Sequence, residues 1–250
     1  MIDLTAQRML AILPCRNEEP SIGPTVRAVA DVLPGTDCLV IDDESGDGTA
    51  RAAREAGARV ISLTVNLGYG AALETGYQFA VENGYDIVLQ LDGDGQHPPT
   101  ELPKLLRPLL AGEADIVLGS RYLKAGDAFP TSVGRRLGQR LFATIVNLAT
   151  RRHFTDPTSG FQALNREAFG LFGRGGIFPS DYPDADILLT AHLAGLRILE
   201  VPVRMLPRLR GSSMHSTLSS GYYVIKMLFS LFIVFLNREK FRAARRRAGS

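Results

Sequence analysis

Two carboxylates separated by a single glycine follow a short, mostly apolar run near the middle of the chain. The run covers residues 87–91, and Asp92, Gly93 and Asp94 come directly after it. Such a run is typical of a buried strand in a parallel sheet, so we expect the acids at the strand's carboxyl end, where ligands bind in open α/β sheets. Carboxylate oxygens suit Mg²⁺ or Mn²⁺, ions that keep coordination positions free for a diphosphate. With Gln96 as a further oxygen ligand, these acids predict a metal–diphosphate site.

The same acids have two other interpretations. In the first, Asp92 and Asp94 are solvated charges in an Asp-Gly turn. The second is a calcium-binding loop, which requires Gly at its sixth position and Glu at its twelfth. His97 and Pro103 stand there, so the spacing excludes a calcium loop. The flanking strand and Gln96 favour the metal–diphosphate site over the simple turn.

The elements that must position these acids alternate along the first half of the chain. Short apolar runs are expected to form strands, and the amphipathic segments between them are expected to form helices. The expected strands are 9–14, 38–41, 59–63, 87–91 and 115–119, and the expected helices are 20–33, 50–56, 71–82 and 100–110. This alternation predicts an α/β fold with a mostly parallel central sheet flanked by helices.

The main alternative interpretation of this α/β pattern is a dinucleotide-binding oxidoreductase. Asp42 and Asp43, at the end of the second expected strand, would suit its ribose contact. That fold needs its glycine fingerprint directly after the first strand, where this chain has residues 14–18, Pro-Cys-Arg-Asn-Glu. Gly68 and Gly70 follow the third strand and lack the third glycine. The sequence therefore disfavours hydride transfer, and it contains no Walker-type phosphate loop.

Composition and charge limit the partners. The chain has 250 residues, 45% of them hydrophobic, which suits one catalytic domain with an appendage. Its formal charge is +2, but residues 237–250 carry +5, so the preceding part is acidic. This distribution argues against a nucleic-acid surface and favours attraction of the tail to an anionic membrane. Cys15 and Cys38 have no metal-ligand spacing and are expected to be buried thiols in a reducing compartment. The first residues form no apolar signal region, so we expect the domain in the cytoplasm.

The C-terminal part is apolar and then basic. Residues 222–236 are almost entirely apolar, but these fifteen residues are fewer than the roughly 20 that span a bilayer, and Lys226 interrupts them. We expect a helix in the cytoplasmic membrane interface, and the alternative is a helix that docks on the body or on another subunit. The predicted division is a catalytic domain over residues 1–217 and a helix with a basic tail over residues 218–250.

Several separate motifs occur in an order that resembles one enzyme family. They are Pro14-x-x-Asn17-Glu18, Asp42-Asp43-x-Ser45-x-Asp47-Gly48-Thr49, Asn66-x-Gly68-x-Gly70, Asp92-x-Asp94-x-Gln96, Gly119-Ser120-Arg121 and Asp156-x-Thr158-Ser159-Gly160-Phe161. In this order they resemble the family-2 inverting glycosyltransferases, and within that family the polyprenyl-phosphate (dolichyl-phosphate) mannose synthases. The match extends from about Met9 to Ser213.

The resemblance implies a glycosyltransferase A-type, nucleotide-sugar-binding fold. It implies that Asp42 and Asp43 contact the base and ribose, and that Asp92, Asp94 and Gln96 hold the metal on the diphosphate. The other residues that it assigns to the nucleotide-sugar site are Pro14, Asn17, Glu18, Gly68, Gly70, Gly93 and Arg210. Helix capping for Asn17 and Glu18, and a helix-entry turn for the two glycines after residue 66, are the structural alternatives.

The resemblance also assigns acceptor chemistry to the second half of the chain. Arg135 or Arg136, at the start of a helix ending near residue 149, would bind the acceptor's phosphate, since a guanidinium suits phosphate oxygens. Ser213 and the nearby His215 would assist, although solvent exposure is the plainer interpretation of the histidine. Asp184 matches the general base of hydroxyl-glycosylating relatives, but Pro183 replaces the Glu that precedes it there.

We therefore expect metal-dependent inverting transfer of a hexose from a nucleoside diphosphate sugar to a polyprenyl phosphate at the cytoplasmic membrane face. GDP-mannose is favoured as donor over a UDP-sugar, Mg²⁺ or Mn²⁺ is the cofactor, and Asp94, Arg121 and Asp184 are the catalytic candidates. A phosphate acceptor is already ionised at neutral pH, so it needs no base. The alternatives are transfer to a sugar or protein hydroxyl with Asp184 as base, and a non-catalytic nucleotide-sugar-binding subunit at the membrane. An oligomer remains an open alternative.

Overall fold

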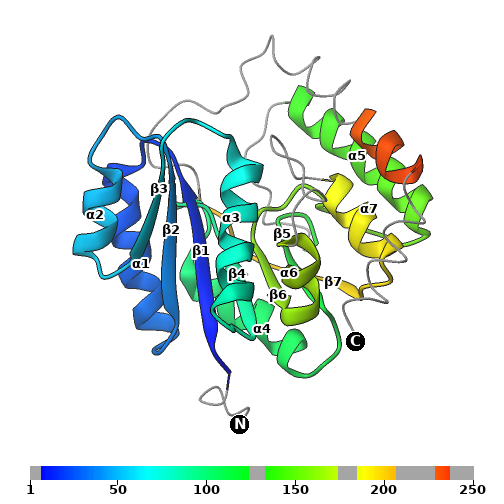
Figure 1. Cartoon of the computed structure of the whole chain (residues 1–250). Coiled ribbons are helices and arrows are strands. Elements are labelled where there is room, and N and C mark those ends of the chain that lie inside the picture. The colour runs from blue at the N-terminus through cyan, green and yellow to red at the C-terminus, as the bar shows by residue number, and fades with distance from the viewer. Residues whose placement is uncertain (1–6, 124–132, 174–184, 207–228, 237–250) are drawn as a thin grey trace.

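A single sheet of seven strands forms the centre of the molecule in the computed structural model, which describes residues 7–123, 133–173, 185–206 and 229–236 (Figure 1). Its strand order is β3-β2-β1-β4-β6-β5-β7. The strands are β1 (Met9–Cys15), β2 (Asp37–Asp43), β3 (Arg59–Leu63), β4 (Ile87–Gln90), β5 (Ile116–Ser120), β6 (Gln162–Asn165) and β7 (Ile198–Pro202). The mostly parallel α/β fold predicted from the sequence is confirmed.

The strand order reverses between β1 and β4. From β1 the chain proceeds outwards to β2 and β3 on one side, and β4 then pairs with the other side of β1, all four strands being parallel. All residues of β1 and β4 are buried, because both faces of these central strands are covered. Crevices at such a reversal, outside the carboxyl ends of the strands, are the usual ligand sites of open α/β sheets. This edge lies at the top of the molecule in Figure 1.

Two strands lie beyond those expected from the sequence. β6 is antiparallel to both β4 and β5, and β7 pairs in parallel with β5 at the sheet's end. β6 has only four residues, Gln-Ala-Leu-Asn, too few for periodicity to reveal it. The consequence for the site is that the loop before β6 lies next to the carboxyl end of β4.

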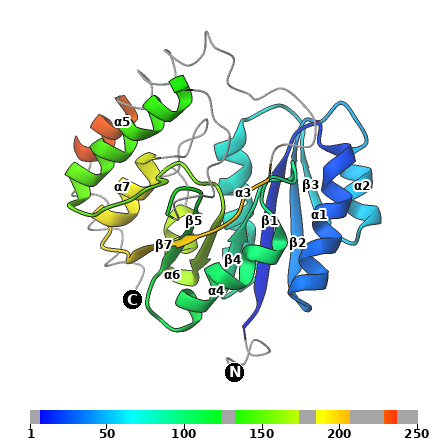
Figure 2. The same ribbon diagram turned by 180° about the vertical axis from the view of Figure 1, so that it is seen from behind.

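Helices cover both faces of the sheet, as Figures 1 and 2 show from opposite sides. One layer contains α1 (Glu19–Val32), α2 (Thr49–Glu55) and α4 (Leu102–Leu110), which follows the 3₁₀ turn Pro99–Glu101. The other layer contains α3 (Tyr69–Glu82), α5 (Val133–Thr150), α6 (Arg166–Phe172) and α7 (Ala185–Leu193). The leucines of α4 illustrate the amphipathic pattern: Leu102, Leu105, Leu106 and Leu109 are all buried.

Residues 229–236 form a helix that packs beside α5 and α7 (Figures 1 and 2). Leu231 and Val234 are buried in the same apolar cluster as Ile187 of α7, and the Ser230 hydroxyl donates a hydrogen bond to the Asp186 carboxylate. One side of this helix is therefore attached to the α/β body of the molecule. Within the described part of the chain, no helix is both long enough and apolar enough to cross a membrane.

Candidate active site

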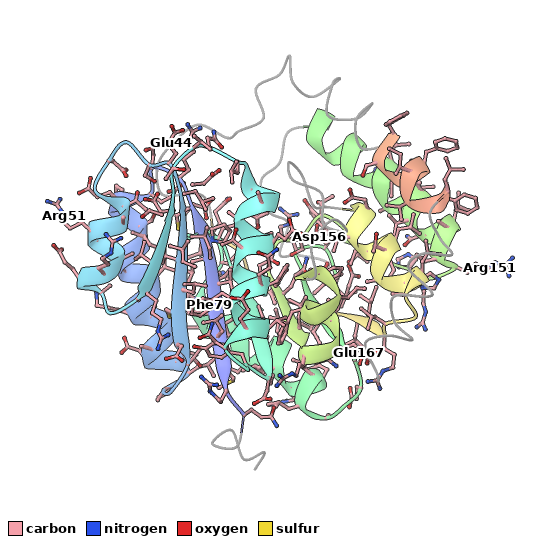
Figure 3. All side chains as sticks on the ribbon, in the orientation of Figure 1. Glu44, Arg51, Phe79, Arg151, Asp156 and Glu167 are labelled. Atoms are coloured by element: carbon pink, nitrogen blue, oxygen red, sulfur yellow. The ribbon has the colours of Figure 1, made fainter. Side chains whose placement is uncertain are left out.

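Carboxylates from three neighbouring strands meet at the carboxyl edge of the sheet. Glu18 follows β1, Asp42 is the penultimate residue of β2, and Asp92 and Asp94 follow β4. Burial raises the pKa of the Cys15 thiol well above its ordinary value, and these four carboxylates raise it further by their negative charge. All four carboxylates are close enough to act on the Cys15 thiol, which is at the end of β1. The four acids therefore lie around the end of this strand. Glu44, directly after β2, marks the same edge in Figure 3.

The glycine between the two acids is required by packing. A Cβ atom on Gly93 would lie only 2.2 Å from Cys15 Sγ and 3.3 Å from a methyl carbon of Ile22. No larger residue fits there unless the end of β1 moves. The sequence assigned Gly93 to the nucleotide-sugar site, and the structure shows that it lets the loop after β4 approach β1 closely.

Asp92 has one oxygen held and one oxygen open. The Tyr69 hydroxyl donates a hydrogen bond of 2.8 Å to Asp92 Oδ1. Oδ2 accepts no hydrogen bond from the described residues and lies 3.8 Å from His97 Nδ1. The Asp92 side chain as a whole is 29% exposed, so a ligand can reach it from outside. A carboxylate fixed through one oxygen and open at the other fits a monodentate metal ligand.

His97 supports the loop that carries both acids, a role for which the sequence gave no signal beyond its place after Gln96. Its Nδ1 accepts the backbone N–H of Asp92 at 3.0 Å, so this nitrogen carries no proton. The ring is buried and stacks on Phe161 with centroids 4.9 Å apart. Burial lowers the pKa of His97, which keeps the imidazole neutral at physiological pH.

Asp94 and Gln96 lie in one tight turn. The backbone N–H of Gln96 donates to Asp94 Oδ1 at 2.9 Å, and Asp94 is 7% exposed. The backbone carbonyl of Gln96 accepts the N–H of Leu206 at 2.9 Å, which joins this turn to the segment after β7. Within the described residues, no group of three or more His, Cys, Asp and Glu side chains could hold a metal alone. Two carboxylates still suit Mg²⁺ or Mn²⁺, because such ions usually complete their shell with water and substrate phosphate oxygens.

Asp43 organises the loop that precedes α3. Its two carboxylate oxygens accept the backbone N–H groups of Leu67 at 2.8 Å and Gly68 at 3.0 Å. Gly68 adopts a φ of 92°, a backbone conformation that favours glycine, and Gly70 is buried in the first turn of α3. The predicted helix-entry turn is therefore present, and both Asp43 oxygens are engaged in forming it.

The loops that follow β1 and β2 are joined by hydrogen bonds. Asn17, with a φ of 56°, donates its N–H to the Ser45 hydroxyl at 2.9 Å and accepts the Gly46 N–H at 2.8 Å. Asp42 Oδ1 accepts the Ser45 N–H at 3.1 Å. Pro14 is a buried residue within β1. The structure thus brings these predicted nucleotide-site residues to one edge and gives Asn17 a role in tying two loops together.

Arg121 forms a buried ion pair. Its Nε and one terminal nitrogen donate to the two oxygens of Asp156, each at 2.7 Å, and its backbone N–H donates to the same carboxylate at 3.1 Å. The two side chains are 10% and 1% exposed. The Glu200 carboxylate of β7 in turn accepts the backbone N–H groups of Thr155 and Asp156. The loop holding Asp156, labelled in Figure 3, is thereby attached to the sheet beside the site.

Several predicted acceptor-site residues lie outside the described residues. Asp184, Arg210, Ser213 and His215 fall in segments that are not described. Arg135 and Arg136 lie in the first turn of α5, and their side chains are not described. Their assignments remain predictions.

Comparison with known proteins identifies the family of the chain. Residues 10–172 match the model of glycosyl transferase family 2. The chain belongs to this family. It is 31% identical over 212 residues to an undecaprenyl-phosphate mannosyltransferase of Micrococcus luteus, covering 82% of this chain and 86% of that protein. A polyprenol monophosphomannose synthase of Mycolicibacterium smegmatis is 30% identical over 214 residues, which is 83% of this chain and 80% of that protein.

The fold also agrees with solved structures. Glucosyl-3-phosphoglycerate synthase from Mycobacterium tuberculosis, crystallised with Mn²⁺, UDP-glucose and phosphoglyceric acid, superposes with a TM-score of 0.70. The superposition covers 92% of this chain and 80% of that chain at 22% identity, so it concerns the fold alone. The glycosyltransferase A-type fold and the family predicted from the motifs are both confirmed. The chain is a glycosyltransferase, and the non-catalytic alternative is set aside.

Proposed function

We propose that this glycosyltransferase moves a hexose, with inversion, from a nucleoside diphosphate sugar to the phosphate of a polyprenyl carrier. The observation that carries the proposal is the pair Asp92 and Asp94 at the strand-order reversal, with Asp92 held through Oδ1 and its side chain 29% exposed. The names of the two relatives described above, each covering more than four fifths of this chain, support a polyprenyl phosphate as acceptor and mannose as the hexose. We favour GDP-mannose as donor, and a UDP-sugar is the alternative.

The donor's diphosphate is proposed to bind over the turn that carries Asp92, Asp94 and Gln96. Four acidic side chains lie around Cys15, and their charge would repel the two phosphates of the donor unless a cation bound between them. A bound Mg²⁺ or Mn²⁺ would supply that charge and stabilise the departing diphosphate. The protein's part is to hold the acids in place, which it does through Tyr69, His97 and the Gln96 backbone.

The acceptor is proposed to need cations more than it needs a base. A phosphomonoester, with a second pKa of about 6, is already an oxyanion at neutral pH. A hydroxyl acceptor would have to lose a proton, and Asp184 is the candidate to take it. Arg135 or Arg136, with Arg210 and Ser213, remain our candidates for binding the acceptor's phosphate.

Replacing Asp184 by asparagine distinguishes the two acceptor classes. With a polyprenyl phosphate and GDP-mannose we expect kcat to fall less than about five-fold, whereas loss of a general base costs about 10²- to 10⁴-fold. The measurement is transfer of radiolabelled mannose to the lipid fraction, with wild type and a UDP-glucose arm in parallel. Failure of the wild-type enzyme to label any polyprenyl phosphate from either donor would overturn the proposed acceptor. A loss above 100-fold in the variant would instead support base catalysis.

We also propose that the enzyme works at an anionic membrane surface, with residues 218–250 as its contact. Leu231, Val234 and the half-buried Ser230 attach the helix of residues 229–236 to the body, while its other side chains are exposed. The exposed apolar set is Phe229, Phe232, Ile233, Phe235 and Leu236, at 43–65% exposure. Six Lys or Arg residues follow within residues 237–250. Apolar side chains beside basic ones are typical of an interfacial contact with anionic lipid.

The double variant Phe232→Ser and Phe235→Ser is expected to weaken membrane binding about ten-fold, because two aromatic side chains no longer leave water. The measurement is co-sedimentation with vesicles of phosphatidylglycerol and phosphatidylcholine. Val81→Ser on α3, also an exposed apolar residue, is the matched control and should bind like wild type. Equal sedimentation of all three proteins, or none by wild type, would refute this surface.

A further inference from the structure

Tyr69 connects two subsites that the sequence treats as separate. It is the first residue of α3, yet its hydroxyl reaches Asp92 Oδ1 at the end of β4. The two residues before it, Leu67 and Gly68, give their N–H groups to Asp43 at the end of β2. In the sheet, β2 and β4 lie on opposite sides of β1. Three consecutive residues thus join an acid on either side of the central strand.

The hydroxyl of Tyr69 is directed by groups behind it. Gln90 Nε2 lies 3.4 Å from this oxygen as a donor, which leaves the hydroxyl proton for Asp92. The Tyr77 hydroxyl donates to Gln90 Oε1, so the amide's orientation is fixed by a fully buried side chain of the same helix. A chain of hydrogen bonds therefore runs from the core, through Gln90 and Tyr69, to one oxygen of Asp92.

The space around the hydroxyl is also restricted. Gly160, in the loop before β6, would bring a Cβ atom to 2.9 Å from the Tyr69 hydroxyl and 3.5 Å from Asp92 Oδ1. Any side chain at position 160 would compete with the hydrogen bond between Tyr69 and Asp92. The glycine in the motif before β6 thus accommodates this pair.

We propose that Tyr69 is a positioning residue of the metal–diphosphate site. It keeps Asp92 Oδ2 facing the ligand, and it couples the loop of Leu67 and Gly68, which Asp43 holds, to the metal. Tyr69 touches neither donor nor metal in this role. Because the Asp43-bound loop carries Tyr69, a nucleotide that orders the loop also orders Asp92. By linkage, the metal strengthens nucleotide binding by the same factor. The inference rests on the proposed function, since it assumes that Asp92 binds a divalent ion.

The test is Mn²⁺ binding to the full chain, measured by electron paramagnetic resonance with and without GDP. Loss of a hydrogen bond that orients a metal ligand typically costs about ten-fold in metal affinity, so Tyr69→Phe should raise the Mn²⁺ dissociation constant in the presence of GDP by about that factor. Saturating Mn²⁺ should restore most of kcat. Tyr85→Phe is the matched control, because the Tyr85 hydroxyl donates to Asp37 at 2.6 Å, at the opposite edge of the sheet. It should leave the Mn²⁺ dissociation constant within two-fold of wild type.

A second variant approaches the same contact from the other side. Gly160→Ala keeps the hydroxyl but displaces it, so it should raise the Mn²⁺ dissociation constant to a similar degree, and the double variant should add little. If wild type binds Mn²⁺ and GDP but Tyr69→Phe binds them equally well, the inference is wrong and the proposed function stands. If wild type with GDP binds no Mn²⁺, both the metal site and this inference fail.

Discussion

Replacing Asp94 by asparagine is expected to lower sugar transfer by at least about 100-fold while leaving the folded state intact. The asparagine side chain keeps an oxygen that can accept the Gln96 N–H, so the turn after β4 can form as before. It removes one negative charge where the proposed metal and the leaving diphosphate meet, and such electrostatic contributions are typically worth 10²- to 10³-fold. The measurements are initial rates at saturating donor and thermal unfolding without ligand.

A control variant tests whether the loss of activity requires removal of a charge at this edge, rather than removal of any carboxylate charge. Asp37→Asn makes the same chemical change at the start of β2, where the carboxylate accepts the Tyr85 hydroxyl. We expect a modest loss of stability and unchanged transfer. Full activity of Asp94→Asn in a properly folded protein would mean that the acid after Gly93 binds no metal, and the metal-dependent mechanism would have to be abandoned.

The location of the site could be predicted because it depends on local signals. A run such as residues 87–91 reads as a buried strand, and the acids that follow must then lie at its carboxyl end. Asp42 and Asp43 follow the same rule, since they are the last two residues of β2. Since parallel strands all end at one edge, two independent local patterns suffice to place four acids together.

What each side chain contacts could not be predicted in the same way. The sequence predicts that Asp43 contacts base and ribose, which stays a prediction, but it did not indicate that both oxygens also hold the loop before α3. The assignment of Gly93 to the nucleotide-sugar site also stays a prediction, and the sequence did not indicate that the Cys15 sulfur excludes a side chain there. Both contacts join residues far apart in the chain, and no periodicity or local propensity encodes them. Tyr69 and His97 were given no role in holding the acids, because a tyrosine in a helix and a histidine in a loop have many ordinary roles.

The strands that the sequence analysis missed have a related explanation. β6 is four residues long and enters the sheet antiparallel between two strands that were expected from the sequence. β7, Ile-Leu-Glu-Val-Pro, places Glu200 among apolar residues. The glutamate breaks the apolar pattern because it accepts hydrogen bonds from the loop that carries Asp156. The local hydrophobic pattern therefore does not predict β7, because Glu200 makes a contact with a segment far away in the sequence.

The largest loss of stability is expected at the Arg121–Asp156 pair. Arg121→Met leaves the Asp156 carboxylate, which is 1% exposed, without its two guanidinium bonds. Removing one partner of a buried pair typically costs about 3–5 kcal/mol, because the remaining charge is neither solvated nor compensated. The measurement is the free energy of unfolding from urea denaturation followed by circular dichroism.

Two controls decide whether Arg121 is structural or catalytic. In the double variant Arg121→Met with Asp156→Leu, no charge is left unpaired, so stability should recover by more than half of the single variant's loss. Arg51→Met removes an exposed pair with Glu19, whose side chains are 72% and 40% exposed, and should cost about 0.5 kcal/mol or less. If Arg121→Met unfolds like wild type but transfers no sugar, the guanidinium takes part in catalysis, in line with its place among the catalytic candidates. If the double variant regains stability and transfers sugar, Arg121 serves the site by holding the loop that carries Asp156 beside β4.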